Sequence, residues 1–332
     1  MWSRKKVQRS SGALSKYYII SDTHIADKTA IDYFGTRKEK DFIALLEIII
    51  VEGATLIING DFLELWKADF GHIKRIYAPL FRKLNEVKRI IYIVGNHDRD
   101  VLEKPELRMK IQLLLPKPEM EIVDSWQDLD ILLFAEHGDV ADSINSVFGI
   151  GRSITWVAGK IERCLGLISP ALSTRFEPFT ENLADSLTPT KTLVKRKVLH
   201  VLERILLWVD LYDLKEGIIL GGHTHEGLEE SPVNDLLEHL LGHNRIKYLN
   251  TGSWVGSGKE DPVLGRDHWR EKEKLKIDEL QFIENQYTKT PLKEDLIVIE
   301  RPSGKISFRG SAREFLASAK TGSFLVKNVS WI

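Results

Sequence analysis

The chain has 332 residues, 43% hydrophobic and 29% charged, a composition typical of a soluble globular protein. Its formal net charge of -1 argues against a protein-wide basic surface for nucleic acid, and its single cysteine excludes an intramolecular disulfide. No stretch approaches the ~18 consecutive apolar residues of a membrane span, and the basic first residues lack the apolar segment of a signal peptide. We therefore expect a cytoplasmic protein with a basic arm at residues 1–16 and one domain at residues 17–332.

The first part of the chain alternates short apolar runs with segments of helical periodicity. The apolar runs predict strands at residues 17–20, 55–59 and 89–94, and the periodic segments predict helices at 38–52 and 73–84. Gly53 is the expected C-cap of the first helix. Repeated strand–helix–strand units predict a mainly parallel sheet covered by helices.

Further strands are expected later in the chain, at residues 131–135, 217–220 and 246–250, with a hairpin at 296–299 and 305–308. Residues 259–295 are dense in alternating charge and are expected to form inert surface. The segment at about 143–212 is helical in pattern and interrupts the alternation. It is either a helical layer packed on a sheet or a cap over the site, where Trp156 and Trp208 would suit an apolar part of a substrate.

Polar residues follow five of the predicted strands. The clusters are Asp22-x-His24, Gly60-Asp61, Gly95-Asn96-His97-Asp98, His137-Gly138-Asp139 and Gly222-His223-x-His225. Residues two apart in an extended segment project to the same side, which brings together Asp22 with His24 and His223 with His225. Carboxylate, amide and imidazole ligands without a thiolate suit Mn, Fe or Zn. Each cluster alone also fits an ordinary polar turn.

Taken in order, the five clusters resemble the calcineurin-like metallophosphoesterase superfamily, whose motifs are D-x-H, G-D, G-N-H-[DE], H and G-H-x-H. The resemblance covers residues 19–225. It implies an α/β fold in which a β-sandwich of two sheets is flanked by helices, with a helical insertion acting as a cap at about 143–212. It also implies a phosphoester hydrolase that uses a bridging hydroxide between two divalent transition metal ions, with Mn expected and Fe or Zn as alternatives.

The resemblance assigns ligands to both ions. The first would be held by Asp22, His24, Asp61 and His225, and the second by Asp61, Asn96, His137 and His223. Asp61 would bridge the two. His97 would stay unligated as the catalytic group that protonates or stabilises the leaving oxygen.

Two carboxylates are candidates for supporting this site. Glu64 stands where related phosphatases often have an Asp that orients the catalytic His, and its alternative is a solvated helix position. Asp98 is a candidate acceptor for a ligand histidine, as is Asp139.

Two further segments narrow the resemblance to the UDP-2,3-diacylglucosamine pyrophosphohydrolase group. These are Gly60-Asp61-Phe62-Leu63-Glu64-Leu65-Trp66 and Asn250-Thr251-Gly252-Ser253-Trp254. The implied reaction cleaves the pyrophosphate of a UDP-linked acylated sugar and releases UMP. His97 is a departure, since typical members of that group have Arg there.

The alternatives are a generic phosphomonoesterase, a cyclic-nucleotide phosphodiesterase and, in a different class, a metal-free protein-binding scaffold. We expect a small-molecule or lipid-linked phosphate substrate and no nucleic-acid partner. Peripheral contact with the inner face of the membrane, through the helical insertion, is a further expectation.

Overall fold

The computed structural model describes residues 16–28, 34–139, 198, 201–202, 204–210, 213–223, 230–254, 296–301 and 303–321. Residues 1–15 of the predicted basic arm, most of the predicted insertion and the charged segment 259–295 lie outside the described residues, whereas Lys16 begins the first strand.

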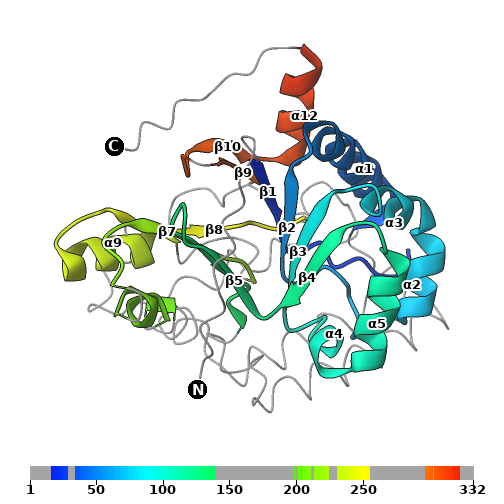
Figure 1. The fold of residues 1–332 in the computed structure, drawn as a ribbon, viewed down its shortest axis with the longest axis horizontal. Coiled ribbons are helices and arrows are strands. Elements are labelled where there is room, and N and C mark those ends of the chain that lie inside the picture. Colours follow the sequence, from blue (N-terminus) through cyan, green and yellow to red (C-terminus); the bar gives the residue numbers. More distant parts are fainter. Residues whose placement is uncertain are drawn as a thin grey trace, which may run out of the picture.

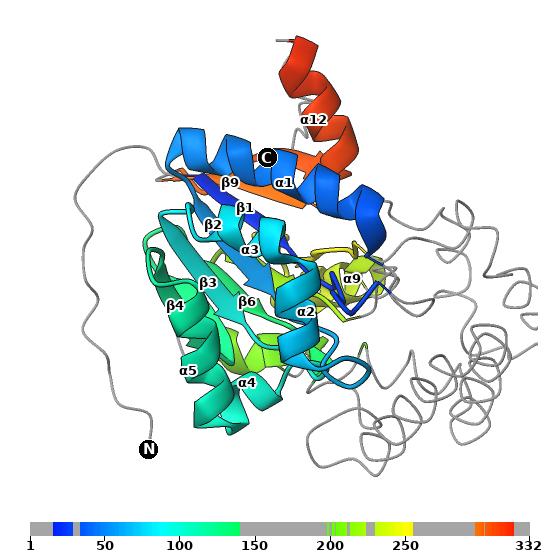
Figure 2. The ribbon, with the colours of Figure 1, turned by 90° about the vertical axis from the view of Figure 1, so that its right-hand side faces the viewer.

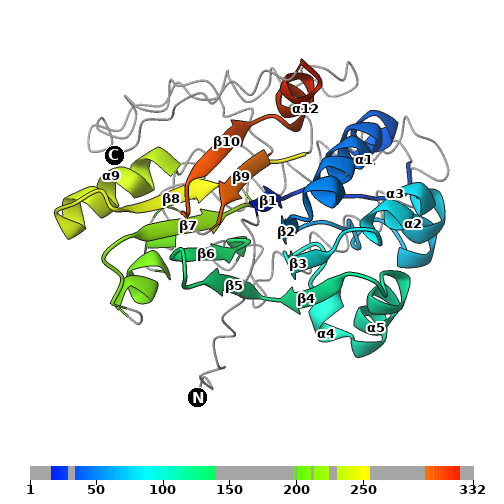
Figure 3. The same ribbon diagram turned by 45° about the horizontal axis from the view of Figure 1, so that its top comes forward.

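Two β-sheets face one another, and helices cover the outer side of each (Figures 1 and 3). The first sheet contains β1 (Lys16–Ile20), β2 (Thr55–Asn59), β3 (Arg89–Ile93), β4 (Glu119–Val123), β9 (Leu296–Glu300) and β10 (Ile306–Gly310). The second contains β5 (Ser125–Asp128), β6 (Leu133–Glu136), β7 (Gly217–Gly221) and β8 (Ile246–Asn250). The helices are α1 (Gly35–Glu52), α2 (Phe70–Ile76), α3 (Ala78–Leu84), α4 (Asp100–Glu103), α5 (Pro105–Leu114), α9 (Glu230–Leu241) and α12 (Ala312–Thr321).

Both sheets are mixed. In the order β10-β9-β1-β2-β3-β4, the strands β1 to β4 are parallel, whereas β9 runs antiparallel to β1 and β10 antiparallel to β9. In the order β5-β6-β7-β8, the last three strands are parallel and β5 is antiparallel to β6. The predicted α/β fold with two sheets flanked by helices is therefore confirmed.

Three clusters of buried side chains hold the layers together. One lies between the first sheet and its helices, a second fills the space between the two sheets, and a third joins the second sheet to α9 and to Val198, Val201, Leu202 and Ile205. Consecutive side chains of β1 lie on opposite faces of the first sheet. Tyr18 belongs to the cluster on the helix side, and Tyr17 belongs to the cluster between the sheets. A strand buried on both faces needs a continuous apolar run, which explains why these strands were visible in the sequence. Figure 2 shows α1, α2 and α3 on one face of the first sheet.

The end of α1 follows the prediction, whereas the helix predicted at 73–84 is wrong in its extent. Gly53 has φ 61° and its N–H points to the carbonyls of Ile49 and Ile50, so it caps α1 as expected. In place of one helix at 73–84 there are two, α2 and α3, which meet at Tyr77. Pro79 lies in the first turn of α3, where the backbone N–H groups have no partner within the helix, so its missing N–H costs no hydrogen bond there. In one continuous helix the same position would lose a hydrogen bond, and the proline therefore separates the two helices.

Candidate metal centre

The polar residues predicted at the strand ends meet at the carboxyl edge of the two sheets. Asp22 and His24 follow β1, Asp61 follows β2, His137 follows β6 and His223 follows β7. Among the described residues, three groups of side-chain ligand atoms each lie within 4.8 Å of one another, and Asp61 belongs to two of them. Those two are Asp22 with His24 and Asp61, and Asp61 with His137 and His223, while the third joins His24 to Glu64 and His97. Asn96 follows β3 and is 2% exposed, while His225 lies outside the described residues.

Backbone hydrogen bonds draw the loops after β1, β2 and β3 together. The N–H of Asp22 donates to the carbonyl of Gly60 at 3.1 Å, and the N–H of His24 donates to the carbonyl of Asp61 at 2.9 Å. The N–H of His97 donates to Oδ1 of Asp61 at 2.9 Å. Hydrogen bonds from the loop after β1 and from the loop after β3 therefore hold Asp61 in place.

Four of the predicted ligands occupy the left-handed region of backbone conformation. The φ angles are 52° for Asp22, 44° for His24, 49° for Asp61 and 72° for His223. Such conformations are strained for residues with a Cβ, at a cost of order 1–3 kcal/mol each, and they concentrate at functional sites. The residue before Asp61 must be a glycine. Gly60 has φ 89°, and an added Cβ there would lie 2.6 Å from Cβ of His137.

The tautomers of two histidines leave nitrogen lone pairs facing carboxylates. Nδ1 of His137 lies 2.9 Å from the carbonyl oxygen of Asn59, which can only accept, so Nδ1 carries the hydrogen. Nε2 of the same ring lies 3.1 Å from Oδ2 of Asp61. His24 repeats the pattern, with Nδ1 3.1 Å from Oε2 of Glu64 and Nε2 3.6 Å from Oδ2 of Asp61. A lone pair beside a carboxylate is repulsive unless a cation or a proton lies between them.

Charge and unmet hydrogen bonds are also consistent with a cation at this position. Burial lowers the pKa of His137, but Asp61 and Asp22 raise it, and the net pKa is well above the ordinary value. Burial raises the pKa of Asp61, whereas His137 and His97 bring it well below its usual range. Both amide atoms of Asn96 and Nε2 of His137 are buried without a hydrogen-bond partner among the described residues. The donor set therefore fits a divalent metal ion, since carboxylate, amide and imidazole atoms converge with their lone pairs exposed to one another.

Asn59 and Ser21, which the sequence did not single out, support these ligands through contacts that join the two sheets. The carbonyl of Asn59 fixes the tautomer of His137, and Nδ2 of Asn59 donates to Oγ1 of Thr251 at 3.3 Å, from the first sheet to the second. Oγ of Ser21 donates to the carbonyl of Gly252 at 2.9 Å, which also joins the sheets. The two halves of the site, carried by different sheets, are thus held in register. A backbone carbonyl has no residue-type signature, so sequence could not reveal the role of Asn59.

Glu64 is 3% exposed, which excludes the solvated alternative. Its Oε2 lies 2.8 Å from Nδ1 of His97 and 3.1 Å from Nδ1 of His24, so one carboxylate serves both imidazoles. Burial lowers the pKa of His97, whereas the carboxylates of Glu64 and Asp61 raise it, and the net direction is upward. Burial lowers the pKa of His24. Glu64 thus raises the pKa of both imidazoles, but the net pKa is raised only for His97, because burial and the neighbouring His97 outweigh the carboxylates at His24.

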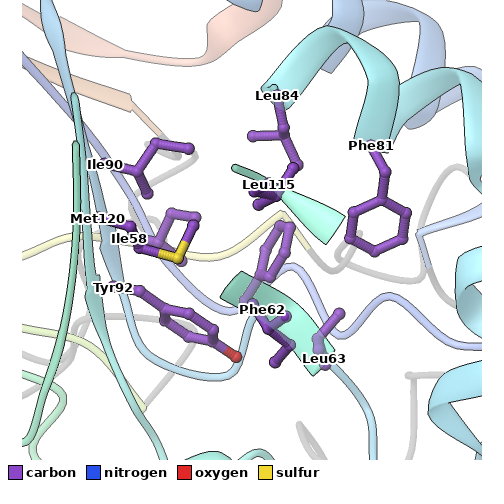
Figure 4. A pocket seen from close by; sticks show the side chains of 10 residues that line it. Ile58, Phe62, Leu63, Phe81, Leu84, Ile90, Tyr92, Leu115 and Met120 are labelled. Atoms are coloured by element: carbon purple, nitrogen blue, oxygen red, sulfur yellow. The ribbon is translucent and has the colours of Figure 1, made fainter. Parts of the chain in front are cut away.

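The carboxylate of Asp98 accepts hydrogen bonds that join neighbouring loops, rather than one from a ligand histidine. Its carboxylate accepts from the N–H of Phe62 at 2.8 Å, the N–H of Gly95 at 2.7 Å and the hydroxyl of Tyr92 at 2.5 Å. Burial and the Asp61 carboxylate raise the pKa of Asp98 to about 7, while the hydrogen bonds from Tyr92 and Gly95 act in the opposite direction. Figure 4 shows Phe62, Leu63 and Tyr92 lining a small apolar cavity beneath this cluster. The loops that carry Asp61 and Asn96 are thus anchored in the core by apolar side chains and joined by one buried carboxylate.

We expect Asp98→Ala to lower the free energy of unfolding by about 3 kcal/mol, because it leaves several buried donors unsatisfied at about 1–3 kcal/mol each. Urea denaturation in the presence of a chelator measures this without any contribution from bound metal. Tyr92→Phe removes only one donor to Asp98 and is the matched variant, with an expected loss of about 1 kcal/mol. Equal losses in the two variants would contradict a central role for the carboxylate.

No helix in the described part of the chain has both the length and the apolar character needed to cross a membrane.

Arg99 lies next to the site, and its guanidinium forms an ion pair with the carboxylate of Asp124.

Comparison with known proteins concerns the same part of the chain. The family described as calcineurin-like phosphoesterase matches residues 15–227, which contain all five polar clusters. No curated protein matches the chain.

Proposed function

Because the chain belongs to the calcineurin-like phosphoesterase family, we propose that its site hydrolyses phosphoester bonds with two divalent transition metal ions. The observation that carries the proposal is the position of Asp61, which is shared by two groups of ligand atoms within 4.8 Å. A carboxylate with two oxygens can bridge two ions. Two bound ions would lower the pKa of a bound water and neutralise phosphate oxygens during in-line displacement.

Each ion would take ligands from both sheets. Asp22, His24, Asp61 and His225 would hold the first, and Asp61, Asn96, His137 and His223 the second. The lone pairs of His24 and His137 that face Asp61 support this division, since one imidazole lies in each group. Mn is the metal we propose, on the basis of the mixed oxygen and nitrogen ligands, with Fe or Zn as alternatives.

The proposed reaction also uses the protein's own proton donor. Glu64 engages Nδ1 of His97, which leaves Nε2 to serve the substrate. The carboxylates of Glu64 and Asp61 raise the pKa of His97, which favours the protonated ring, the form that can give a proton to a leaving oxygen.

Glu64→Gln should shift the alkaline limb of the pH profile of kcat to lower pH. The change removes a negative charge beside His97, so the pKa of the ring falls. A proton donor is active only when protonated, so activity is lost at a lower pH. Glu86→Gln, at an exposed glutamate that pairs with Lys83, is the control and should leave the profile unchanged. An unmoved alkaline limb in Glu64→Gln would argue against His97 as the donor.

Two substrate classes are consistent with this centre. The segments 60–66 and 250–254 favour the pyrophosphate of a UDP-linked acylated sugar, with its acyl chains under a helical cap. His97, in place of the Arg of that group, favours a phosphomonoester or phosphodiester. Incubation of the Mn-loaded protein with UDP-2,3-diacylglucosamine and with a cyclic nucleotide in parallel tests the choice. Release of UMP from the lipid alone supports the first class, and hydrolysis of the cyclic nucleotide alone supports the second.

A further inference from the structure

An ion pair joins the hairpin of β9 and β10 to the first residue of α9. The Nη1 and Nη2 atoms of Arg309, in β10, donate to Oε1 and Oε2 of Glu230 at 2.8 and 2.6 Å, so the contact is bidentate. The side chains are 16% and 13% exposed. Both residues lie after the part of the chain that matches the family, and neither belongs to the groups of ligand atoms found among the described residues.

Glu230 also holds the end of β8. Its Oε2 accepts from the backbone N–H of Asn250, the last residue of that strand, at 2.8 Å. The carboxylate therefore joins a side chain of the first sheet to the backbone of the second. The planar guanidinium of Arg309 matches both carboxylate oxygens at once, which keeps the carboxylate oriented toward β8.

Asn250 in turn holds the loop that carries His223. Its Nδ2 donates to the carbonyl of Gly222 at 3.3 Å, and its Oδ1 accepts from the N–H of Gly252 at 2.8 Å. The N–H of Gly222 donates to the carbonyl of His137 at 2.7 Å. Gly222 is therefore connected to two predicted ligands, since His223 follows it in the chain and His137 accepts its hydrogen bond.

The surroundings of Gly222 leave little room for a displacement. An added Cβ at Gly222 would lie 2.9 Å from Oγ of Ser21 and 3.0 Å from Oδ2 of Asp22, both in the loop after β1. The N–H of His223 donates to the same Oδ2 of Asp22 at 3.2 Å. A shift of Gly222 therefore changes the position of His223 relative to ligands carried by both sheets.

We propose that Arg309 and Glu230 are positioning residues for the second of the two proposed metal ions. That ion is the one assigned to His137 and His223, so the inference rests on the proposed function. Arg309 orients Glu230, Glu230 holds the end of β8, and Asn250 holds the loop after β7. Loss of the ion pair therefore loosens the loop that carries His223. Part of the metal affinity then resides in a hairpin and a helix that the family match does not include.

The test measures binding of Mn²⁺ to Arg309→Met by isothermal titration calorimetry, after a chelator has removed bound metal. We expect the binding step of the second ion to weaken about tenfold or more, as is typical when a residue that supports a metal ligand is changed. Asn96→Ala, which removes a ligand assigned to the second ion alone, identifies that step. Arg309→Met removes a positive charge, which by itself would strengthen binding of a cation, so weaker binding reports position. An unchanged step would overturn the inference.

Arg301→Met is the matched control. Arg301 directly follows β9 in the same hairpin, its side chain is also 16% exposed, and it also forms ion pairs with the second sheet, through Asp128 and Asp130. Asp128 is paired with the first residue of β6, whereas His137 follows the last residue of that strand. We expect both variants to have a lower melting temperature, and Arg301→Met to keep both Mn²⁺ binding steps unchanged. Equal weakening in the two variants would show a merely structural effect and overturn the assignment.

Glu230→Gln keeps the inference testable if Arg309→Met fails to fold. It preserves the size of the side chain and removes the charge that pairs with Arg309, and we expect the same binding step to weaken. The double variant should bind the second ion no more weakly than Arg309→Met, because the two residues act as one unit. Losses that multiply would overturn this shared role. If the unaltered protein binds no Mn²⁺, the proposed function fails and the inference with it. If it binds two ions and Arg309→Met binds both equally well, the inference alone fails.

Discussion

Asp61→Ala should lower kcat for p-nitrophenyl phosphate by at least about a thousandfold, which corresponds to about 4 kcal/mol of transition-state stabilisation. Asp61 is shared by the two groups assigned to the proposed ions, and its Oδ2 lies 3.1 Å from Nε2 of His137 and 3.6 Å from Nε2 of His24. Its removal therefore affects both proposed ions at once, whereas loss of any other ligand affects one. Steady-state kinetics with saturating Mn²⁺ measures the effect.

Asp213→Ala is the matched control for Asp61→Ala. Asp213 also has a left-handed backbone, with φ 48°, but its side chain is 83% exposed and pairs only with Lys215 among the ion pairs described. The backbone strain that alanine adds at a positive φ would be similar in the two variants, so a difference in activity reports the carboxylate. Asp61→Asn keeps the shape and removes the charge. Activity of Asp61→Ala within about tenfold of the unaltered protein would contradict a bridging role.

Gly95→Ala is expected to reduce kcat by about a hundredfold, since a misplacement of about 1 Å at a catalytic site can cost that much. An added Cβ at this position would lie 2.7 Å from the backbone nitrogen of Asp61 and 2.7 Å from Cδ2 of His137. A backbone atom cannot turn aside as a flexible side chain can, so the loops after β2 and β3 must separate. We also expect a loss of about 1–3 kcal/mol in stability from overpacking.

Gly242→Ala separates these effects. Gly242 has φ 69°, and a Cβ there would meet nothing within 4 Å. The substitution should cost about 1 kcal/mol of stability through its backbone conformation and leave kcat unchanged. Thermal denaturation together with kinetics distinguishes the two variants. Full activity in Gly95→Ala would mean that the two loops do not need their present separation.

The sequence revealed the sheets where strands are buried on both faces. β1, β2 and β3 are nearly continuous apolar runs, and each ends at a polar cluster. β5 was missed because Ser125–Asp128 is half-exposed and polar, with no apolar run to detect. α9 was also missed, although Val233 and Leu237 are buried one helical turn apart and provided a usable pattern.

The residue types of the site were accessible from sequence, and the resemblance predicted the contact of Glu64 with His97, but the other connections were not accessible. Motif order assembled Asp22, Asp61 and His137 as candidates, because each follows an apolar strand. The sharing of Glu64 between His24 and His97 depends on two loops far apart in sequence, so no local pattern records it. The same holds for Asp98, whose partners are mainly backbone N–H groups that any residue could supply.

Metal content of the purified protein tests the central claim most directly. The protein is loaded with Mn²⁺, desalted and analysed by mass spectrometry for metal per chain, alongside Asp61→Ala and Asp213→Ala. We expect about two ions per chain in the unaltered protein and in Asp213→Ala, and a clear loss in Asp61→Ala. No bound ion in the unaltered protein would contradict the two-metal centre and favour a metal-free binding scaffold on the same fold.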